Sequence, residues 1–311
     1  MLRTLTLTLS VLTMMHVASV PLTNLALIAP CHATGPSPQP SPLLQAQRIV
    51  SIGSDVTEFL AALGAGDRIV AVDTTSRVPP DVVRGKPDVG YMRALSAEGV
   101  LALAPTHIIA SAGAGPAEAV RALKAASIAF VEVPSEPTAL GTLAKIAVIG
   151  NATGRITEAE ALARSITEAY DRLDERRRGI AAPRRVLFIL NASGGRTIVG
   201  GHGTSADAAL ALAGASNAAS RLEGYKPVTD EGLIAMAPDA VIVMQGGREG
   251  AGPDEIARAA WVRSTPAGSG AEPRVTGVDG SALLSFGPRT PAVVGDLMTW
   301  LYPEPAKAGK S

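Results

Sequence analysis

The chain has 311 residues, of which 47% are hydrophobic, 18% are charged and only 3% are aromatic. This composition supports a hydrophobic core in one large or two medium domains and excludes wholesale disorder. The formal net charge is zero, with 28 basic and 28 acidic residues and no long basic run, which excludes nucleic acid as a partner.

The first 33 residues have the features of a secretory signal peptide. Met1-Leu2-Arg3 supplies a positive start, an apolar stretch continues to Ile28, and Cys31-His32-Ala33 resembles an A-x-A cleavage site. Polar residues interrupt the apolar stretch, which disfavours a membrane anchor. The residues around Cys31, the only cysteine, loosely resemble a lipoprotein cleavage box, but the preceding proline disfavours lipidation. We therefore expect export to the periplasm and no cysteine chemistry in the mature chain.

A regular alternation of short apolar runs and helix-like segments begins at Arg48, after a Pro/Ser-rich leader. Continuous β-branched runs of this kind are typical of parallel strands that are covered on both faces by helices. Strands are predicted at residues 49–52, 69–72, 107–110, 130–133, 186–190, 240–243 and 275–278. Residues 54–58 combine a hydroxyl with acidic side chains, as at a helix start, and Gly64 supplies a helix stop. The glycine-rich residues 191–204 are typical of a hairpin that follows a buried strand.

A long amphipathic helix is predicted over residues 157–178. Thr157-x-x-Glu160 has the form of a capping box, and apolar residues then recur at helical spacing opposite a charged face. Its 22 residues would extend about 33 Å, which is long for a helix inside one α/β layer. We therefore expect it to link two lobes and to permit only modest closure between them.

An internal repeat supports two lobes of related fold. "LSAEGVLALAPTHIIA" (residues 95–110) aligns without gaps to "VTDEGLIAMAPDAVIV" (residues 228–243), so that Glu98 and Glu231 are matched, and a Gly-Tyr pair precedes each copy. The fold class is therefore predicted as α/β, with two Rossmann-like lobes, parallel-type central sheets and a ligand cleft between the lobes. The expected organisation is a signal peptide (1–33), a flexible leader (34–47), an N-terminal lobe (48–155), a linking helix (156–180), a C-terminal lobe (181–304) and a tail (305–311).

Enzyme motifs are missing from the sequence. It contains no H-E-x-x-H, no G-x-S-x-G and no P-loop, and only His107 and His202 would remain after removal of the signal peptide. His107 lies in an apolar run and is predicted to be a core histidine, whereas His202 lies in a glycine-rich turn and is a candidate ligand. Residues 111–116 lack the dinucleotide-binding spacing and predict a strand-to-helix turn. The chain is therefore predicted to bind a ligand rather than to catalyse a reaction, without a catalytic cofactor.

The strongest chemical candidate is the pair Tyr91 and Arg93, in a glycine-led loop of a chain that has only four tyrosines. A tyrosine phenolate is a hard oxygen donor that suits ferric iron. Its ordinary pKa near 10 disfavours the phenolate at neutral pH, but bound Fe(III) and a neighbouring guanidinium both favour it. The alternative is an ordinary loop tyrosine whose ring packs on the surface.

Several motifs together closely resemble the periplasmic haem-binding proteins of bacterial haem ABC importers, over residues 48–302. They are "VGYMRALSAEGVLAL", "GGHGTSADAALALAG", "YKPVTDEGLIAMAPDAVIVM" and "LLSFGPRT". The resemblance implies that Tyr91 is the axial ligand of the haem iron, supported by Arg93, and that Glu98 and Glu231 dock on arginines of an inner-membrane permease. Weaker candidates for lining the cleft near the haem propionates are Tyr225, Lys226, Arg248, Arg289 and His202.

One departure concerns the number of haems. Some relatives carry a Ser-His-Gly-Gly turn associated with a second haem, where this chain has Asn191-Ala-Ser-Gly-Gly195. The cargo implied is haem b, and one route to the periplasm would run through an outer-membrane haem receptor. The alternatives are a ferric-siderophore or cobalamin binder of the same fold, an envelope oxidoreductase or haem-degrading enzyme, and a haem sensor without a transporter.

Overall fold

The structure is a computed structural model that describes residues 47–246 and 250–303. The predicted signal peptide, Cys31, Arg248 and the predicted tail lie outside these residues, as does the leader apart from Gln47. Within the described ranges, no helix has both the length and the apolar composition needed to cross a membrane.

The first lobe is built on a four-stranded parallel sheet with the strand order β2-β1-β3-β4. Its strands are β1 (Ile49–Ile52), β2 (Ile69–Val72), β3 (His107–Ser111) and β4 (Ala129–Val133). Its helices are α2 (Ser54–Ala62), η1 (Gly66–Arg68), α3 (Pro80–Val83), α4 (Ala97–Leu101), α5 (Ala117–Ala125) and α6 (Ala139–Thr153). Ile108 and Ile109 are both fully buried but belong to different hydrophobic clusters. Helices therefore cover both faces of this sheet, as the apolar runs predict.

The second lobe contains a mixed sheet with the order β10-β9-β5-β6-β8, and β7 pairs with β5. Its strands are β5 (Arg185–Ser193), β6 (Arg196–Gly200), β7 (Ser216–Asn217), β8 (Tyr225–Val228), β9 (Ala240–Gln245) and β10 (Val275–Asp279). Its helices are α8 (Ser205–Leu212), α9 (Asp230–Ala235), α10 (Pro253–Arg258), α11 (Ala260–Arg263), η2 (Pro266–Gly268), α12 (Gly280–Leu284) and α13 (Thr290–Leu301).

This sheet differs from the expected parallel arrangement at one edge. Gly194 and Gly195 have φ angles of 58° and 72°, which two-residue hairpin turns require, so β6 returns antiparallel to β5. β8 then pairs antiparallel with β6 at the sheet edge. Pro227 lies in β8, where its missing N–H is tolerated because an edge strand needs no donor on its outer side. The predicted hairpin is confirmed, and the parallel order holds for β10, β9 and β5.

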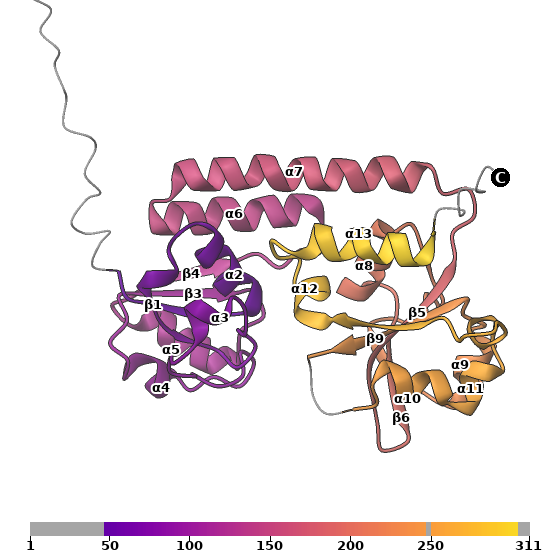
Figure 1. Ribbon diagram of the computed structural model, residues 1–311. Coiled ribbons are helices and arrows are strands. Elements are labelled where there is room, and N and C mark those ends of the chain that lie inside the picture. The colour runs from indigo at the N-terminus through magenta and orange to yellow at the C-terminus, as the bar shows by residue number, and fades with distance from the viewer. Residues whose placement is uncertain (1–46, 247–249, 304–311) are drawn as a thin grey trace, which may run out of the picture. The chain divides into compact units, whose positions relative to one another are not determined.

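The long helix between the two sheets is α7 (Ile156–Arg178), with 23 residues. It packs against α6 and α13 (Figure 1). The predicted capping box is wrong, because the N-cap residue is Arg155 and Thr157 already lies inside the helix. Only Gly154, with φ of 68°, and Arg155 separate α6 from α7, so the chain re-enters a helix before Thr157 is reached. Ser54 is likewise the first helical residue of α2 rather than its cap.

The repeat is preserved in three dimensions. Ser96 and Thr229 are the N-cap residues of α4 and α9, and each side chain accepts a hydrogen bond from the backbone N–H three residues later. Ala104 and Ala237, at matched positions after the two helices, have φ angles of 48° and 43°. Non-glycine residues rarely adopt this left-handed conformation, so its presence at both sites indicates that the two copies share backbone geometry.

One hydrophobic cluster contains residues from both lobes. Phe59 of the first lobe and Phe188 and Phe286 of the second are at most 1% exposed and belong to this cluster, with side chains from α6, α7 and α13. The opposite face of each sheet has its own separate cluster. The two lobes therefore share a core on the side that carries α7.

Candidate functional site

Tyr91 lies in a loop that is fixed to the carboxyl end of β2. Val72 forms a parallel bridge with Asp88, and the Asp88 carboxylate accepts a hydrogen bond from the Gly90 N–H at 2.7 Å. Gly90 has a φ of 90°, a conformation that favours glycine. The backbone thus turns immediately before Tyr91, and 42% of this tyrosine is exposed.

The glycine-rich turn after β3 holds the other side of this loop. The Gly115 N–H donates to the carbonyl oxygen of Met92 at 2.8 Å, and the Leu95 N–H donates to the carbonyl oxygen of Gly115 at 2.8 Å. Arg93 lies between these two contacts and is exposed. The turn joins β3 to α5, as predicted. Both loops lie at the carboxyl edge of a parallel sheet, which is where open α/β sheets bind ligands.

Tyr225 is the first residue of β8 and is 37% exposed. Its ring lies over Gly200, where an added Cβ would be 3.3 Å from Tyr225 Cε1. Burial raises the pKa of the Tyr225 phenol, and interactions with Ala206 and Thr204 and the charge of Arg93 act in the opposite direction. The structure therefore brings Arg93 of the first lobe near Tyr225 of the second.

Lys226 and His202 lie near Tyr225 at the edge where β8 pairs with β6. Lys226 is exposed and pairs in register with Val199 of β6. His202 forms a parallel bridge with Glu223, and its Nδ1 lies 3.3 Å from an Asp207 carboxylate oxygen. The His202 side chain is 68% exposed, so it is accessible from solvent. His107, predicted to be a core histidine, is partly buried in β3, contacts Gln47 and Thr106, and has its pKa lowered by burial.

Glu98 and Glu231 occupy equivalent positions in the first turns of α4 and α9, and both are exposed. A hydrogen bond from its own backbone N–H, followed by one from Thr229, lowers the pKa of Glu231, which is therefore ionised at neutral pH. The structure thus places one exposed carboxylate on each lobe at the same point of the repeated unit.

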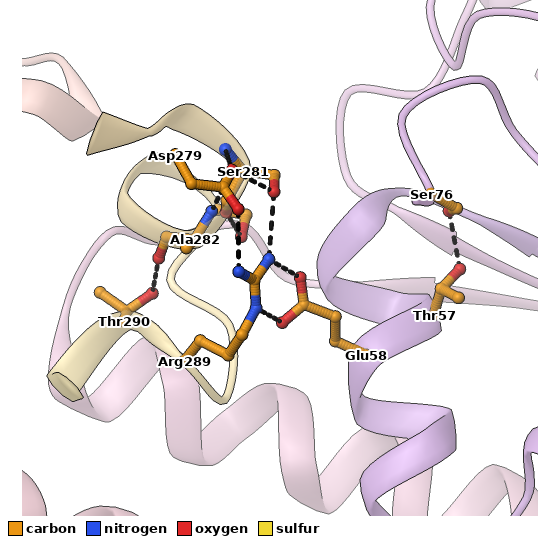
Figure 2. Close-up of polar contacts among 9 residues, drawn as sticks. Thr57, Glu58, Ser76, Asp279, Ser281, Ala282, Arg289 and Thr290 are labelled. Atoms are coloured by element: carbon orange, nitrogen blue, oxygen red, sulfur yellow. Dashed lines mark hydrogen bonds and ion pairs between the residues drawn. The ribbon is translucent and has the colours of Figure 1, made fainter. Parts of the chain in front are cut away.

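Arg289 lies in an ion-pair cluster with Glu58 and Asp279. Figure 2 shows its guanidinium between Glu58 of α2 and Asp279 of β10. Nε and Nη2 donate to the two Glu58 carboxylate oxygens at 2.9 and 2.7 Å, and Nη1 donates to Asp279 at 2.8 Å. A further bond from Nη2 reaches the Ser281 hydroxyl at 3.1 Å. Arg289 thus ties the second lobe to the first.

The same cluster borders a cavity of about 330 Å³ with an almost wholly apolar lining. It is lined by Glu58, Ala61, Ala62, Val78, Pro79, Pro288 and Arg289. None of the predicted ligand-binding residues except Arg289 lies in it. We assign no ligand to this cavity, because its polar groups are already paired with each other.

A buried ion pair of the first lobe, which also contacts the second lobe through Ser285, was not predicted from the sequence. Lys145 Nζ lies 2.7 Å from an Asp55 carboxylate oxygen, and the two side chains are 2% and 6% exposed. Lys145 also donates to the carbonyl oxygen of Ser285, and the Ser111 hydroxyl donates to Asp55 at 2.6 Å. A lone lysine in the apolar run of α6 is the signal that could have indicated a buried partner.

No metal site accompanies these residues. Among the residues that the structure describes, no group of three or more His, Cys, Asp or Glu side chains could hold a metal ion.

Comparison with known proteins places the chain among extracytoplasmic binding proteins. A structure of the periplasmic heme-binding protein RhuT from Roseiflexus sp. RS-1, in apo form, superposes with a TM-score of 0.76 and 34% identity, over 82% of this chain and 98% of RhuT. The periplasmic heme-binding protein BhuT in complex with two hemes gives a TM-score of 0.76 and 35% identity, over 82% and 97%. The uncharacterized ABC transporter substrate-binding lipoprotein YvrC of Bacillus subtilis (strain 168) is 28% identical over 264 residues, 84% of this chain and 82% of YvrC.

The fold and the family model agree with these similarities. Two α/β lobes joined by a long helix are what the sequence predicts and what the structure has. The sequence model of the periplasmic binding protein family matches residues 49–271, which include strands and helices of both lobes. The chain belongs to the periplasmic binding protein family.

Proposed function

We propose that this chain is an exported solute-binding protein that captures ferric haem between its two lobes and delivers it to an inner-membrane ABC importer. The observation that carries the proposal is Tyr91, a large exposed aromatic side chain on a loop held by hydrogen bonds on both sides. Such a loop fixes the backbone of Tyr91 before the ligand arrives, which lowers the cost of binding. Two relatives with the same fold and about a third of residues identical are heme-binding proteins by name.

We assign different roles to Tyr91 in the loop and Tyr225 at the start of β8. Tyr91 would bind the haem iron as a phenolate, and Arg93 would stabilise the negative charge. Burial raises the pKa of Tyr225, so its phenol would stay protonated and act as a hydrogen-bond donor. Lys226 is exposed on the same strand and is the better candidate for a propionate partner, because Arg289 already makes four hydrogen bonds.

The test is a titration of the purified mature apo-protein with haemin, followed by absorption spectroscopy. Tyr91→Ala should change the Soret and charge-transfer bands of the complex, whereas Tyr225→Phe should leave them in place. A Tyr91→Ala variant with unaltered bands would overturn the ligand assignment. Displacement of haemin by a ferric siderophore or by cyanocobalamin would favour the alternative cargo. Turnover of the bound haem on addition of a reductant would favour an enzyme.

We propose a cargo of one haem per chain. The BhuT relative holds two hemes, but this chain has no histidine among residues 191–195, which form the β5–β6 hairpin. A titration should therefore reach its end point at one equivalent of haemin. An end point at two equivalents would show that another residue holds the second haem.

We further propose that Glu98 and Glu231 dock on basic residues of the permease. Each is exposed and each lies at the same position of one copy of the repeat. Opposite charges across an interface raise the association rate and fix the orientation of the partners. Glu98→Lys and Glu231→Lys should abolish haem uptake and leave haemin affinity unchanged. Uptake at the normal rate by the double variant would contradict docking through these residues.

The proposed location is the periplasm, reached through the N-terminal signal peptide, with lipidation at Cys31 disfavoured. The YvrC relative is a lipoprotein, so the question has a direct test. Mass spectrometry of the protein purified from its native envelope should give the mass of a chain that is cleaved after Ala33 and carries no lipid.

A further inference from the structure

The two helices that carry the proposed docking glutamates, α4 with Glu98 and α9 with Glu231, are called the docking helices. At the end of each, backbone carbonyl groups accept hydrogen bonds from an arginine at the start of a central strand. In the first lobe, Arg48 precedes β1, and its guanidinium donates from Nη2 to the Leu103 carbonyl oxygen at 2.9 Å and from Nε to that of Ala104 at 3.1 Å. These carbonyls follow α4, the helix that carries Glu98.

The second lobe repeats this arrangement with different residues. Arg185 is the first residue of β5, and its Nη2 donates to the Met236 carbonyl oxygen at 2.9 Å. Met236 is the C-cap residue of α9, which carries Glu231, and it is the repeat equivalent of Leu103.

The backbone of each arginine is also fixed at an equivalent point. The Arg48 N–H donates to the Thr106 hydroxyl at 2.8 Å, and the Arg185 N–H donates to the Asp239 carboxylate at 2.8 Å. In return, the N–H groups of Thr106 and Asp239 donate to the carbonyl oxygens of Arg48 and Arg185 at 3.0 and 2.7 Å. Thr106 and Asp239 are matched positions in the repeat. These side-chain and backbone hydrogen bonds of one arginine are together called the arginine clamp. The same clamp occurs in both lobes, although the residues that accept the backbone N–H bond differ.

A clamp of this kind matters because the two helices are very short. α4 has five residues and α9 has six, and helices of this length are not stable by themselves. The C-terminal end of each helix carries the negative end of the helix dipole, which a nearby cation stabilises. In each lobe a guanidinium lies at this end, bonded to the two carbonyls that follow the C-cap of α4 and to the C-cap carbonyl of α9. Ser96 and Thr229 cap the opposite ends.

We infer that Arg48 and Arg185 are positioning residues for permease docking, which hold Glu98 and Glu231 in the geometry that the permease recognises. This inference rests on the proposed docking role of the two glutamates. Loss of a clamp would lower the fraction of molecules with a correctly placed glutamate, and the apparent affinity for the permease would fall by the same factor.

The experiment uses the cognate permease and its ATPase in proteoliposomes, with haemin-loaded binding protein titrated against the rate of ATP hydrolysis. Arg48→Met and Arg185→Met should each raise the concentration that gives the half-maximal rate by about threefold, and the double variant by about tenfold. The maximal rate and the haemin affinity should not change. Arg48→Lys and Arg185→Lys keep the charge and one donor, so they should recover part of the loss.

Arg176→Met is the matched control. Arg176 also donates to a helix carbonyl, that of Gly295 at 3.1 Å, but it joins α7 to α13 and bonds neither α4 nor α9. This variant should have a lower melting temperature and an unchanged half-maximal concentration.

The outcomes separate the inference from the proposed function. If the arginine variants lower only the melting temperature, as Arg176→Met does, the inference is wrong and the arginines are structural. If Glu98→Lys and Glu231→Lys also leave the half-maximal concentration unchanged, the docking proposal fails and the inference with it. If a methionine variant does not fold, the lysine variants provide the comparison.

Discussion

At the scale of single residues, Lys145 and Asp55 form a buried ion pair in which each charge compensates the other. They are 2.7 Å apart and almost fully removed from water, and Ser111 and the Ser285 carbonyl complete their hydrogen bonding. Lys145→Met should lower the free energy of unfolding by about 3–5 kcal/mol, because it leaves a buried carboxylate without its counter-charge. Denaturation in urea, monitored by circular dichroism, gives the measurement.

The double variant Asp55→Leu/Lys145→Met provides the control for this prediction. Removal of both charges leaves neither group uncompensated, so its loss should be smaller than that of Lys145→Met alone. A double variant as unstable as the two single variants combined would show that the two residues act independently, and the charge argument would then fail.

At the residue scale, the sequence indicates loops with a local glycine pattern but not contacts between residues that are far apart in the chain. Tyr91 and Arg93 stand two positions apart in one loop, and their exposure follows from the glycine that precedes them. Arg289 was expected near a haem propionate but pairs with Glu58, which lies 231 positions earlier in the chain. No local pattern links these two residues, because their contact depends on how the two lobes meet.

At the scale of elements, the α6–α7 hairpin depends on one small residue. A Cβ added to Gly150 would lie 2.5 Å from the Cβ of Ala159, so the two helices pack too closely for any side chain there. Gly150→Ala should therefore lower the free energy of unfolding by about 1–3 kcal/mol, although alanine normally stabilises a helix relative to glycine. Thermal unfolding of the variant measures the change.

Two further variants isolate the steric cause. Gly295→Ala changes a glycine in α13 whose nearest neighbour to an added Cβ is the flexible Arg176 guanidinium, at 3.5 Å, so it should be neutral or stabilising. Gly150→Ala/Ala159→Gly moves the methyl group to the other helix and should recover most of the loss. If Gly150→Ala proves as stable as the original protein, the helices are free to separate at this point.

The elements themselves were largely predictable, since seven strands were expected near the positions of β1 to β5, β9 and β10. The strand β8 was not predicted, because its proline disfavours a strand and only its edge position makes that proline tolerable. The start of α7 was misplaced because Thr157 has capping chemistry that the two-residue turn before the helix does not use. The arginine clamps were missed because Arg48 and Arg185 do not share the spacing of the repeat.

At the scale of the whole molecule, apolar and polar contacts together join the lobes. The cluster that contains Phe59 and Phe286 draws on both lobes, and Arg289, Lys145 and Thr142 bond across the same boundary. Packed interfaces of this kind resist continuous deformation. The structure therefore gives a physical reason for the modest closure that the single linking helix predicts.

The pH dependence of stability tests the interlobe ion pair directly. Burial raises the pKa of Glu58 above its ordinary value of 4.5, in spite of the hydrogen bonds and charge of Arg289. The folded protein therefore binds a proton at this site at a higher pH than the unfolded chain does. It follows that the contribution of Glu58 to the free energy of unfolding increases as the pH falls from neutrality towards 4.5.

The pKa of Asp279 is shifted in the opposite direction, so it affects stability at a lower pH than Glu58 does. Burial alone would raise its pKa, but hydrogen bonds from Arg289, Ser281 and Ala282 hold it below the ordinary 3.8. Its stabilising contribution is therefore complete above pH 3.8 and is lost as the pH falls further. Measurements between pH 7 and pH 4.5 thus report on Glu58 without interference from Asp279.

We accordingly expect the difference in unfolding free energy between the original protein and Glu58→Gln to be larger at pH 4.5 than at pH 7. Glutamine keeps the size of the side chain but cannot take up the proton, so only the original protein gains stability as the pH falls. Urea denaturation at the two pH values and equal ionic strength measures this difference. Glu168→Gln, at an exposed position on α7, is the control for general charge effects. If the difference in unfolding free energy stays constant or shrinks at pH 4.5, burial does not dominate the pKa of Glu58 and the prediction is wrong. A smaller difference at pH 4.5 would mean that the Arg289 bonds outweigh burial. The ion pair between the lobes would then be net favourable at neutral pH.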